Sequence, residues 1–119
     1  MVAYIITGLV AIEAIGIMFL EIFGSPEQQA KSFELEASFV KIPEVKSLLG
    51  NQGIYNGLLG ALIFGTMFFL EGPQQILMLQ MEMAFVIIAA IYGSFTAARK
   101  IIIIQGLPAL IALIALFLK

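Results

Sequence analysis

The sequence predicts an all-α integral membrane protein, folded as one domain over residues 1–119 into an antiparallel bundle of four transmembrane helices. Hydrophobic residues make up 61% of the chain and charged residues 12%, whereas an ordinary soluble domain is roughly 45–50% apolar and about 25% charged. A soluble domain of this size lacks the interior to hide so much apolar side chain. The apolar residues also gather in four segments near the length of roughly 20 residues that a helix needs to cross a hydrocarbon core. The predicted spans are residues 2–23, 52–70, 74–97 and 101–118.

The first span ends at the helix-breaking sequence Gly24-Ser25-Pro26. Because this apolar segment lies at the N-terminus, it must be distinguished from a signal peptide. It lacks a basic leading segment and a convincing cleavage site, and Glu13 and Glu21 interrupt its apolar run. We therefore interpret it as a retained transmembrane helix.

The loop after the first span opens with a helix-start signal. Ser25 is suited to cap a helix whose first residue is Pro26, and Gln28 stands three residues after the serine. Apolar residues then recur at helical spacing among charged ones. This pattern predicts a short amphipathic helix at the cytoplasmic interface, and an ordinary solvated loop helix fits it equally well. Pro43 ends the segment and starts another helix that continues into the second span.

The basic residues predict the orientation of the chain in the cell membrane. Five of them lie in the first and third loops, whereas only Lys119 follows the fourth span. We therefore expect these two loops on the cytoplasmic side and both termini outside. The connection between the second and third spans, residues 71–73, is short enough to force a tight antiparallel hairpin. The basic loop residues are Lys31, Lys41, Lys46, Arg99 and Lys100.

The residue types that the chain lacks exclude several kinds of chemistry. Histidine and cysteine are absent, which excludes Cys/His zinc sites, disulfides, thiol chemistry and a histidine-activated nucleophile. There is no phosphate-binding loop of the GxxxxGK type. The net charge is −2, and the charged residues are not grouped in a patch. No nucleic-acid partner is therefore expected. We predict no metal, no cofactor and no catalytic residue, and an enzyme is the least favoured class.

Residues 51–57 read Asn-Gln-Gly-Ile-Tyr-Asn-Gly and lead directly into the second span. Polar side chains in a membrane helix are costly unless they have partners, so this cluster predicts a binding site. Small residues recur at intervals of four, at Gly53, Gly57, Ala61 and Gly65. Such a ladder lets the backbone of a neighbouring helix approach closely.

Polar residues of the other spans reach the same depth as this cluster, which predicts a cup in the cytoplasmic half of the bundle. Glu13 and Glu82 lie deeper in their spans, and each is interpreted either as a proton or cation site or as a neutral carboxylic acid that bonds to another helix. The whole polar set also admits a simpler interpretation, in which it holds the helices together. The predicted ligand-binding residues are Glu13, Glu21, Asn51, Gln52, Tyr55, Asn56, Glu82, Tyr92 and Gln105.

The cluster at residues 51–57, with four further motifs, resembles the signature of domain-of-unknown-function family 1304, a family of small bacterial four-helix membrane proteins. The resemblance covers most of the chain and implies the four-span fold, but it supplies no function. Family members often carry His and Trp where this chain has Ala14 and Gly24, so any role tied to that histidine is absent here. The other matching segments are Glu13 with Glu21-Ile22-Phe23, Pro43 to Lys46, residues 89–93 and residues 105–109.

A second, narrower resemblance is to small multidrug-resistance exporters, which are also short four-span proteins with a glutamate in the first helix. The sequence around Glu13 is similar to theirs, and the later aromatic positions are not. We expect a membrane protein that binds or transports a small polar or cationic ligand. The alternatives are a structural or lipid-binding subunit of a membrane complex and a proton-coupled exporter. The expected partners are the lipid bilayer, such a ligand or a lipid headgroup, and a second copy of the chain.

Overall fold

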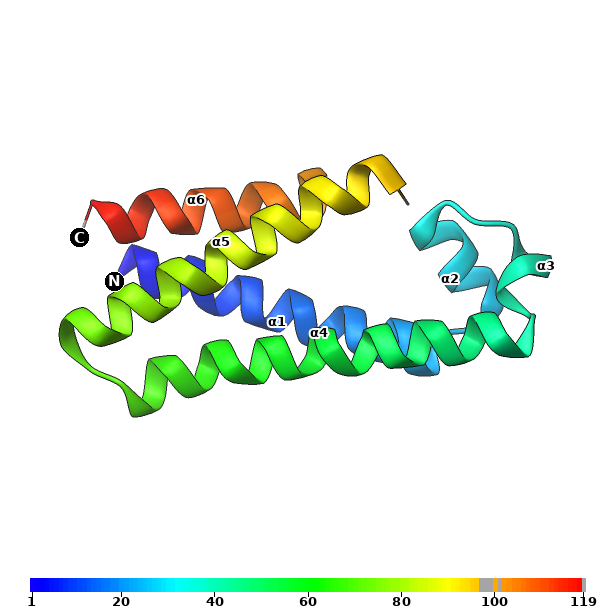
Figure 1. The fold of residues 1–119 in the computed structure, drawn as a ribbon, viewed down its shortest axis with the longest axis horizontal. Helices are drawn as coiled ribbons and strands as arrows, with labels where there is room; N and C mark the ends of the chain where they lie inside the picture. Colours follow the sequence, from blue (N-terminus) through cyan, green and yellow to red (C-terminus); the bar gives the residue numbers. More distant parts are fainter. Residues whose placement is uncertain (97–99, 101, 119) are drawn as a thin grey trace.

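The computed structural model describes residues 1–96, 100 and 102–118, and these residues are almost entirely helical, with no strand among them (Figure 1). The all-α prediction is thus confirmed. The helices are α1 (Val2–Phe23), α2 (Pro26–Phe33), α3 (Ala37–Val40), α4 (Pro43–Phe69), α5 (Gly72–Thr96), the π-helical stretch η1 (Ile102–Gly106) and α6 (Leu107–Phe117). Four residues used in the predictions lie outside the described residues: Arg99 and Lys119, which were used to predict the orientation, and residues 97 and 101, which end the third and begin the fourth predicted span.

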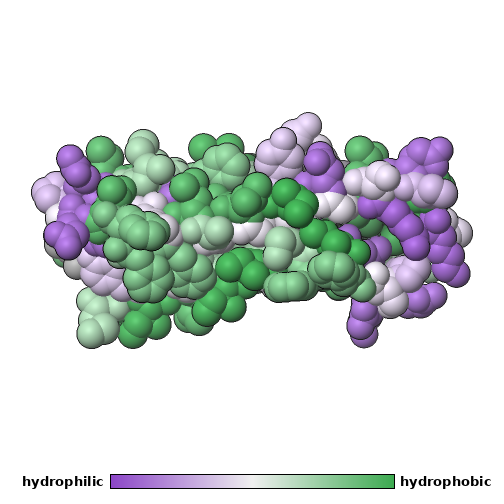
Figure 2. Space-filling view, turned by 90° about the horizontal axis from the view of Figure 1, so that it is seen from below, coloured by the Kyte–Doolittle hydropathy of each residue, from purple (hydrophilic) through white to green (hydrophobic). Residues whose placement is uncertain are grey.

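Three helices, α1, α4 and α5, are long and apolar enough to cross a membrane, and η1 with α6 forms a shorter apolar helix over Ile102–Phe117. On the face that Figure 2 shows, hydrophobic side chains cover most of the middle of the molecule, and hydrophilic ones gather toward its two ends. Such a belt matches the layering of a bilayer, in which the core is apolar and both faces are polar. The structure therefore supports a membrane protein.

Several boundaries of the helices follow the sequence signals, but the single short helix predicted for the first loop proves to be two, α2 and α3, because Glu34 takes a left-handed conformation (φ 57°) that ends α2. Ser25 caps α2 in a capping box, in which its hydroxyl accepts from the Gln28 backbone at 3.2 Å and the Gln28 side chain accepts from the Ser25 backbone at 2.9 Å. The second predicted span proves to be the later part of α4, which begins at Pro43 and runs without a break to Phe69.

The π-helical stretch was not predicted. Pro108 has no backbone N–H, so the carbonyl of Ile104 lacks its usual α-helical donor four residues on, and η1 ends at Gly106, two residues before this proline. The wider turn carries Gln105 and is the only π-helical stretch among the described residues.

Helices α1 and α4 lie against each other because glycines let their backbones come close. At Gly60 an added Cβ would stand 2.6 Å from the carbonyl oxygen of Ala11, and at Gly53 it would stand 3.1 Å from Cβ of Glu21. The contact thus runs through Gly53, Gly57 and Gly60, whereas Ala61 of the predicted ladder is exposed. A helix turns once per 3.6 residues, so a step of three after a step of four keeps the glycines on one face.

The apolar core lies toward the end of the bundle that holds the two termini, where residues of α1, α4, α5 and α6 meet (Figure 1). Toward the other end, α5 moves away from α4 and ends near α2. We call this the α2 end. The helices therefore separate into two pairs there, α1 with α4 and α5 with η1 and α6. The fully buried core side chains include Ala11, Ile63, Leu79, Met83, Ala109 and Ala112.

Candidate functional site

The carboxylate of Glu21 joins α1 to α4 at the α2 end of the bundle. Its side chain is almost completely buried, and its two oxygens accept one hydrogen bond each, from Gln52 Nε2 at 2.5 Å and from Asn56 Nδ2 at 2.6 Å. Gln52 and Asn56 are four residues apart and so lie on one face of α4. Gly53, between them, permits the close approach that brings Glu21 within reach. We call the side chains of Glu21, Gln52 and Asn56 the Glu21 clamp.

A third amide, that of Gln29, secures the C-terminal end of α1. The last carbonyls of a helix have no partner within it, and here Gln29 of α2 donates from Nε2 to the carbonyl oxygens of Leu20 at 2.9 Å and Glu21 at 3.1 Å. The Lys100 ammonium donates to the Lys31 carbonyl at 3.0 Å, which holds α2 from the opposite side. Helix α2 is thereby fixed across the end of the bundle.

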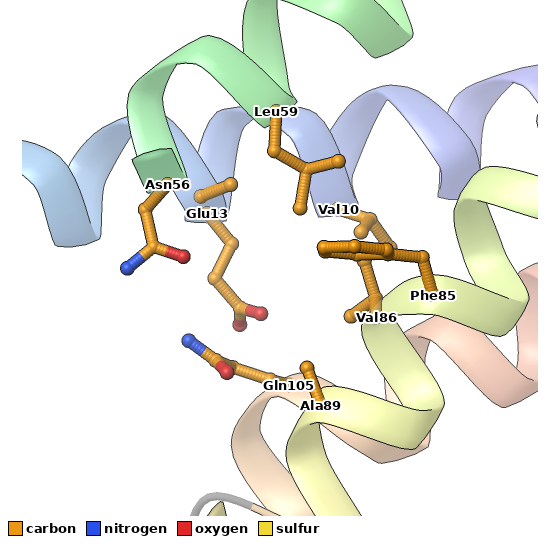
Figure 3. Close-up of a pocket in the computed structure, with 9 residues that line it drawn as sticks. Val10, Glu13, Asn56, Leu59, Phe85, Val86, Ala89 and Gln105 are labelled. Atoms are coloured by element: carbon orange, nitrogen blue, oxygen red, sulfur yellow. The ribbon is translucent and has the colours of Figure 1, made fainter. Parts of the chain in front are cut away.

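Glu13 faces a small chamber of about 50 Å³ between the two helix pairs. Figure 3 shows the side chains of Glu13, Asn56 and Gln105 pointing toward one another, with apolar side chains of α1, α4 and α5 beside them. Among the described residues, Glu13 has no hydrogen-bond or ion-pair partner. The residues that line the small chamber are Val10, Glu13, Ala14, Asn56, Leu59, Phe85, Val86, Ala89 and Gln105.

A large chamber of about 410 Å³ adjoins the small one and lies nearer α2. The two share Asn56, Ala89 and Gln105 in their walls. The volume of the large chamber falls within the range of roughly 300–1,000 Å³ that is common for small-molecule sites. It is lined by Ile17, Phe33, Gln52, Asn56, Ala89, Tyr92, Gly93, Thr96 and Gln105.

The clamp fixes which atom of Asn56 faces the small chamber. Because Asn56 Nδ2 is bonded to Glu21, its Oδ1 is turned the other way, and Figure 3 shows this oxygen on the chamber side. Gln52 is committed to Glu21 in the same manner. The clamp therefore leaves the oxygens of both amides as hydrogen-bond acceptors: Asn56 lines the small chamber with Glu13, and Gln52 lines the large chamber.

The structure brings six of the nine predicted site residues into this region and leaves three outside it. Glu13, Gln52, Asn56, Tyr92 and Gln105 line the chambers, and Glu21 supports them from behind. Asn51 and Tyr55 are exposed and line neither chamber. Each precedes a clamp residue by one position, which turns it about 100° around the helix.

Glu82 lies in a separate polar cluster nearer the termini. It is buried, its Oε2 accepts from the Thr66 hydroxyl at 2.9 Å, and its Oε1 is buried with no partner among the described residues. Near it, Gln75 accepts from the Tyr4 hydroxyl at 2.6 Å and donates to the carbonyls of Met67 and Leu70 at the end of α4. This cluster ties the helical hairpin of α4 and α5 to α1.

Sequence reasoning missed the aromatic walls of the chambers. Phe33 of α2 closes one side of the large chamber, and Phe85 of α5 stands beside the small one. A phenylalanine within or beside an apolar segment carries no signal that separates a pocket wall from a lipid-facing side chain. Gln29, the cap of α1, was missed because its partner carbonyls lie in another helix.

Comparisons with known proteins give a family without an assigned activity. A family model described as "Protein of unknown function (DUF1304)" matches residues 8–117. The chain is similar to "Uncharacterized protein YpaA" of Lactococcus lactis subsp. lactis (strain IL1403), with 37% identity over 114 residues that cover 95% of this chain and 94% of that protein. No solved structure gives a significant match to the chain.

Proposed function

Because the chain belongs to the DUF1304 family, whose description supplies no activity, we propose its function from the geometry of the site: it binds a small polar or cationic molecule in the two chambers between its helix pairs. The single observation that carries this proposal is the contrast between two glutamates of α1. Glu21 has both oxygens bonded within the protein, whereas Glu13 faces a chamber without a partner among the described residues.

A purely structural role, in which polar residues hold the helices together, explains the position of Glu21 but not that of Glu13. Glu13 is half-buried, and an acid taken even partly out of water without a partner costs free energy; a chain gains nothing from that cost if the side chain merely stands in a cavity. A ligand, or water that a ligand displaces, supplies the missing partner. The purely structural alternative fits the cluster around Glu82 and Gln75 better, because its hydrogen bonds run from helix to helix.

We further propose that Ile102–Phe117 is the fourth span, which completes the predicted four-helix bundle. Alone it is shorter than the roughly 20 residues that a span needs, but α6 packs against both α1 and α5, and its residues Ala109, Ala112 and Leu116 belong to their common core. A helix that lies beside two candidate spans at the same depth is in the bilayer with them.

The chambers then open toward the cytoplasm. Lys31, Lys41, Lys46 and Lys100 all belong to the α2 end, and an excess of basic residues marks the cytoplasmic side. The opposite end is closed by the apolar core. A ligand therefore enters from the cytoplasmic side, and transport across the membrane requires a second conformation in which that core separates.

Single-cysteine labelling tests whether the chambers admit small molecules, since the natural chain contains no cysteine. Ala89 and its neighbour Ile88 are both exposed, but Ala89 lines both chambers and Ile88 lines neither. In lipid nanodiscs we expect Ala89→Cys to react with N-ethylmaleimide at least about tenfold faster than Ile88→Cys, because a thiol in hydrocarbon rarely forms the reactive thiolate. Equal, slow labelling of both would contradict the proposed site.

A further inference from the structure

We infer that the ligand is a protonated primary amine that carries an apolar group, with its ammonium group in the small chamber. This inference rests on the proposed function, because it names the class of molecule for the same chambers. Its basis is the Glu21 clamp, whose residues determine which atoms of the site are left to face a ligand.

The groups that face the chambers are mainly hydrogen-bond acceptors. They comprise the Glu13 carboxylate and the oxygens of Asn56 and Gln52, whose nitrogens are bonded to Glu21. Gln105 has no partner among the described residues, so its amide is free to present either end. Among the described residues that line the two chambers, none is basic. An anion would meet repulsion here, whereas a positively charged N–H donor in the small chamber finds the Glu13 carboxylate and the oxygen of Asn56.

The walls favour an organic cation over a metal ion. Calcium takes six to eight oxygen ligands and magnesium requires near-octahedral oxygen geometry, and the described residues contain no group of three or more acidic or other metal-binding side chains. Around Glu13 the walls are instead hydrocarbon, from Val10, Leu59, Phe85 and Val86. Such walls suit the carbon atoms next to the ammonium group of an amine.

Because the two chambers differ in volume, we assign the ammonium group to the small chamber and the rest of the ligand to the large one. A bound water needs roughly 10–15 Å³ of such space, so the small chamber, at about 50 Å³, has room for roughly three to five groups of that size, such as an ammonium and the first carbons attached to it. The large chamber, at about 410 Å³, accommodates a ring-sized group between Phe33 and Tyr92. A free amine or the ethanolamine headgroup of a lipid presents the same primary ammonium.

The test measures how three probes of equal size slow the labelling of Ala89→Cys in phosphatidylcholine nanodiscs. Benzylamine is a protonated amine, benzyl alcohol is neutral and benzoate is an anion. We expect benzylamine to protect the cysteine at concentrations at least about tenfold below those needed for benzyl alcohol, since a hydrogen bond to a charged group is worth more than a neutral one. Benzoate should not protect. Ile88→Cys, measured in parallel, corrects for probes that only partition into lipid.

The outcomes separate this inference from the proposed function. Suppose that Ala89→Cys labels fast, but benzylamine does not slow the labelling, or benzyl alcohol or benzoate slows it equally well. This result would contradict the amine as the ligand class and would leave the proposed binding site intact. Slow labelling of Ala89→Cys without any probe would overturn both. Nanodiscs that contain phosphatidylethanolamine distinguish the two sources of the ammonium: protection by this lipid alone assigns the site to its headgroup, and protection only by benzylamine assigns it to a free amine.

Glu21 acts as a positioning residue for this selectivity. In Glu21→Gln the new amide presents one N–H₂ group to the clamp, so Asn56 or Gln52 must turn its oxygen away from the chambers to accept from it. We expect the preference for benzylamine over benzyl alcohol to shrink severalfold. Glu82→Gln is the matched control, because Glu82 is a buried glutamate outside both chambers. An unchanged preference in Glu21→Gln, or an equal loss in Glu82→Gln, would show that the clamp does not orient the site.

Discussion

The close contact between α1 and α4 makes Gly60 the least replaceable small residue of α4. In Gly60→Ala the added Cβ would stand 2.6 Å from the Ala11 carbonyl oxygen and 2.7 Å from Cγ1 of Ile15. The first of these neighbours is backbone, so a change of side-chain rotamer cannot relieve the clash. The helices must move apart, and overpacking of this kind typically costs about 1–3 kcal/mol.

Gly65→Ala is the matched control for this substitution. It lies in the same helix, and its new Cβ would meet only Cδ2 of Phe69 at 3.9 Å, an ordinary contact. Both variants gain the same helix propensity, up to about 1 kcal/mol over glycine, so the difference between them isolates the packing. We expect Gly60→Ala to be about 1–3 kcal/mol less stable than Gly65→Ala when unfolding in mixed detergent micelles is followed by circular dichroism. Equal stability, or a more stable Gly60→Ala, would refute the close contact.

Two further predictions concern the clamp and the orientation. Asn56→Ala removes a hydrogen bond to a buried carboxylate and should lower the free energy of unfolding by about 1.5–3 kcal/mol. Asn51→Ala, an exposed control five residues earlier, should change it by less than about 0.5 kcal/mol. A loss in Asn51→Ala as large as that in Asn56→Ala would contradict the clamp. For the orientation, an impermeant thiol reagent applied to intact cells should label Gln74→Cys, whereas Ser38→Cys should be labelled only after the membrane is opened. Labelling of Ser38→Cys from outside, alone or together with Gln74→Cys, would contradict the assigned topology.

The helices could be predicted from local signals, because each boundary depends on a few adjacent residues. Gly24-Ser25-Pro26 ends α1 and starts α2, and Pro43 starts α4, as expected. The π-helical turn at η1 was not predicted, since Pro108 constrains the preceding turn without specifying how the chain adapts.

The composition of the site was only partly predictable, because it depends on how each helix is rotated about its axis. The cluster at residues 51–57 contains four polar side chains, and the sequence does not say which of them face α1. The choice follows from the packing of Gly53, Gly57 and Gly60 on α1, which turns Gln52 and Asn56 toward Glu21 and leaves Tyr55 exposed. Periodicity located the polar face to within one residue, and the contact between the helices decided the rest.

Chemical modification of the three membrane glutamates in one sample tests the ligand site most directly. Glu21 and Glu82 are almost completely buried, whereas Glu13 faces the small chamber. After treatment of the natural protein in nanodiscs with a membrane-permeant carbodiimide, and with no amine added, peptide mass spectrometry should find Glu13 modified and the other two intact. Modification of Glu82 or Glu21 to the same extent as Glu13, or an unreactive Glu13, would contradict the claim that this glutamate stands open to a ligand.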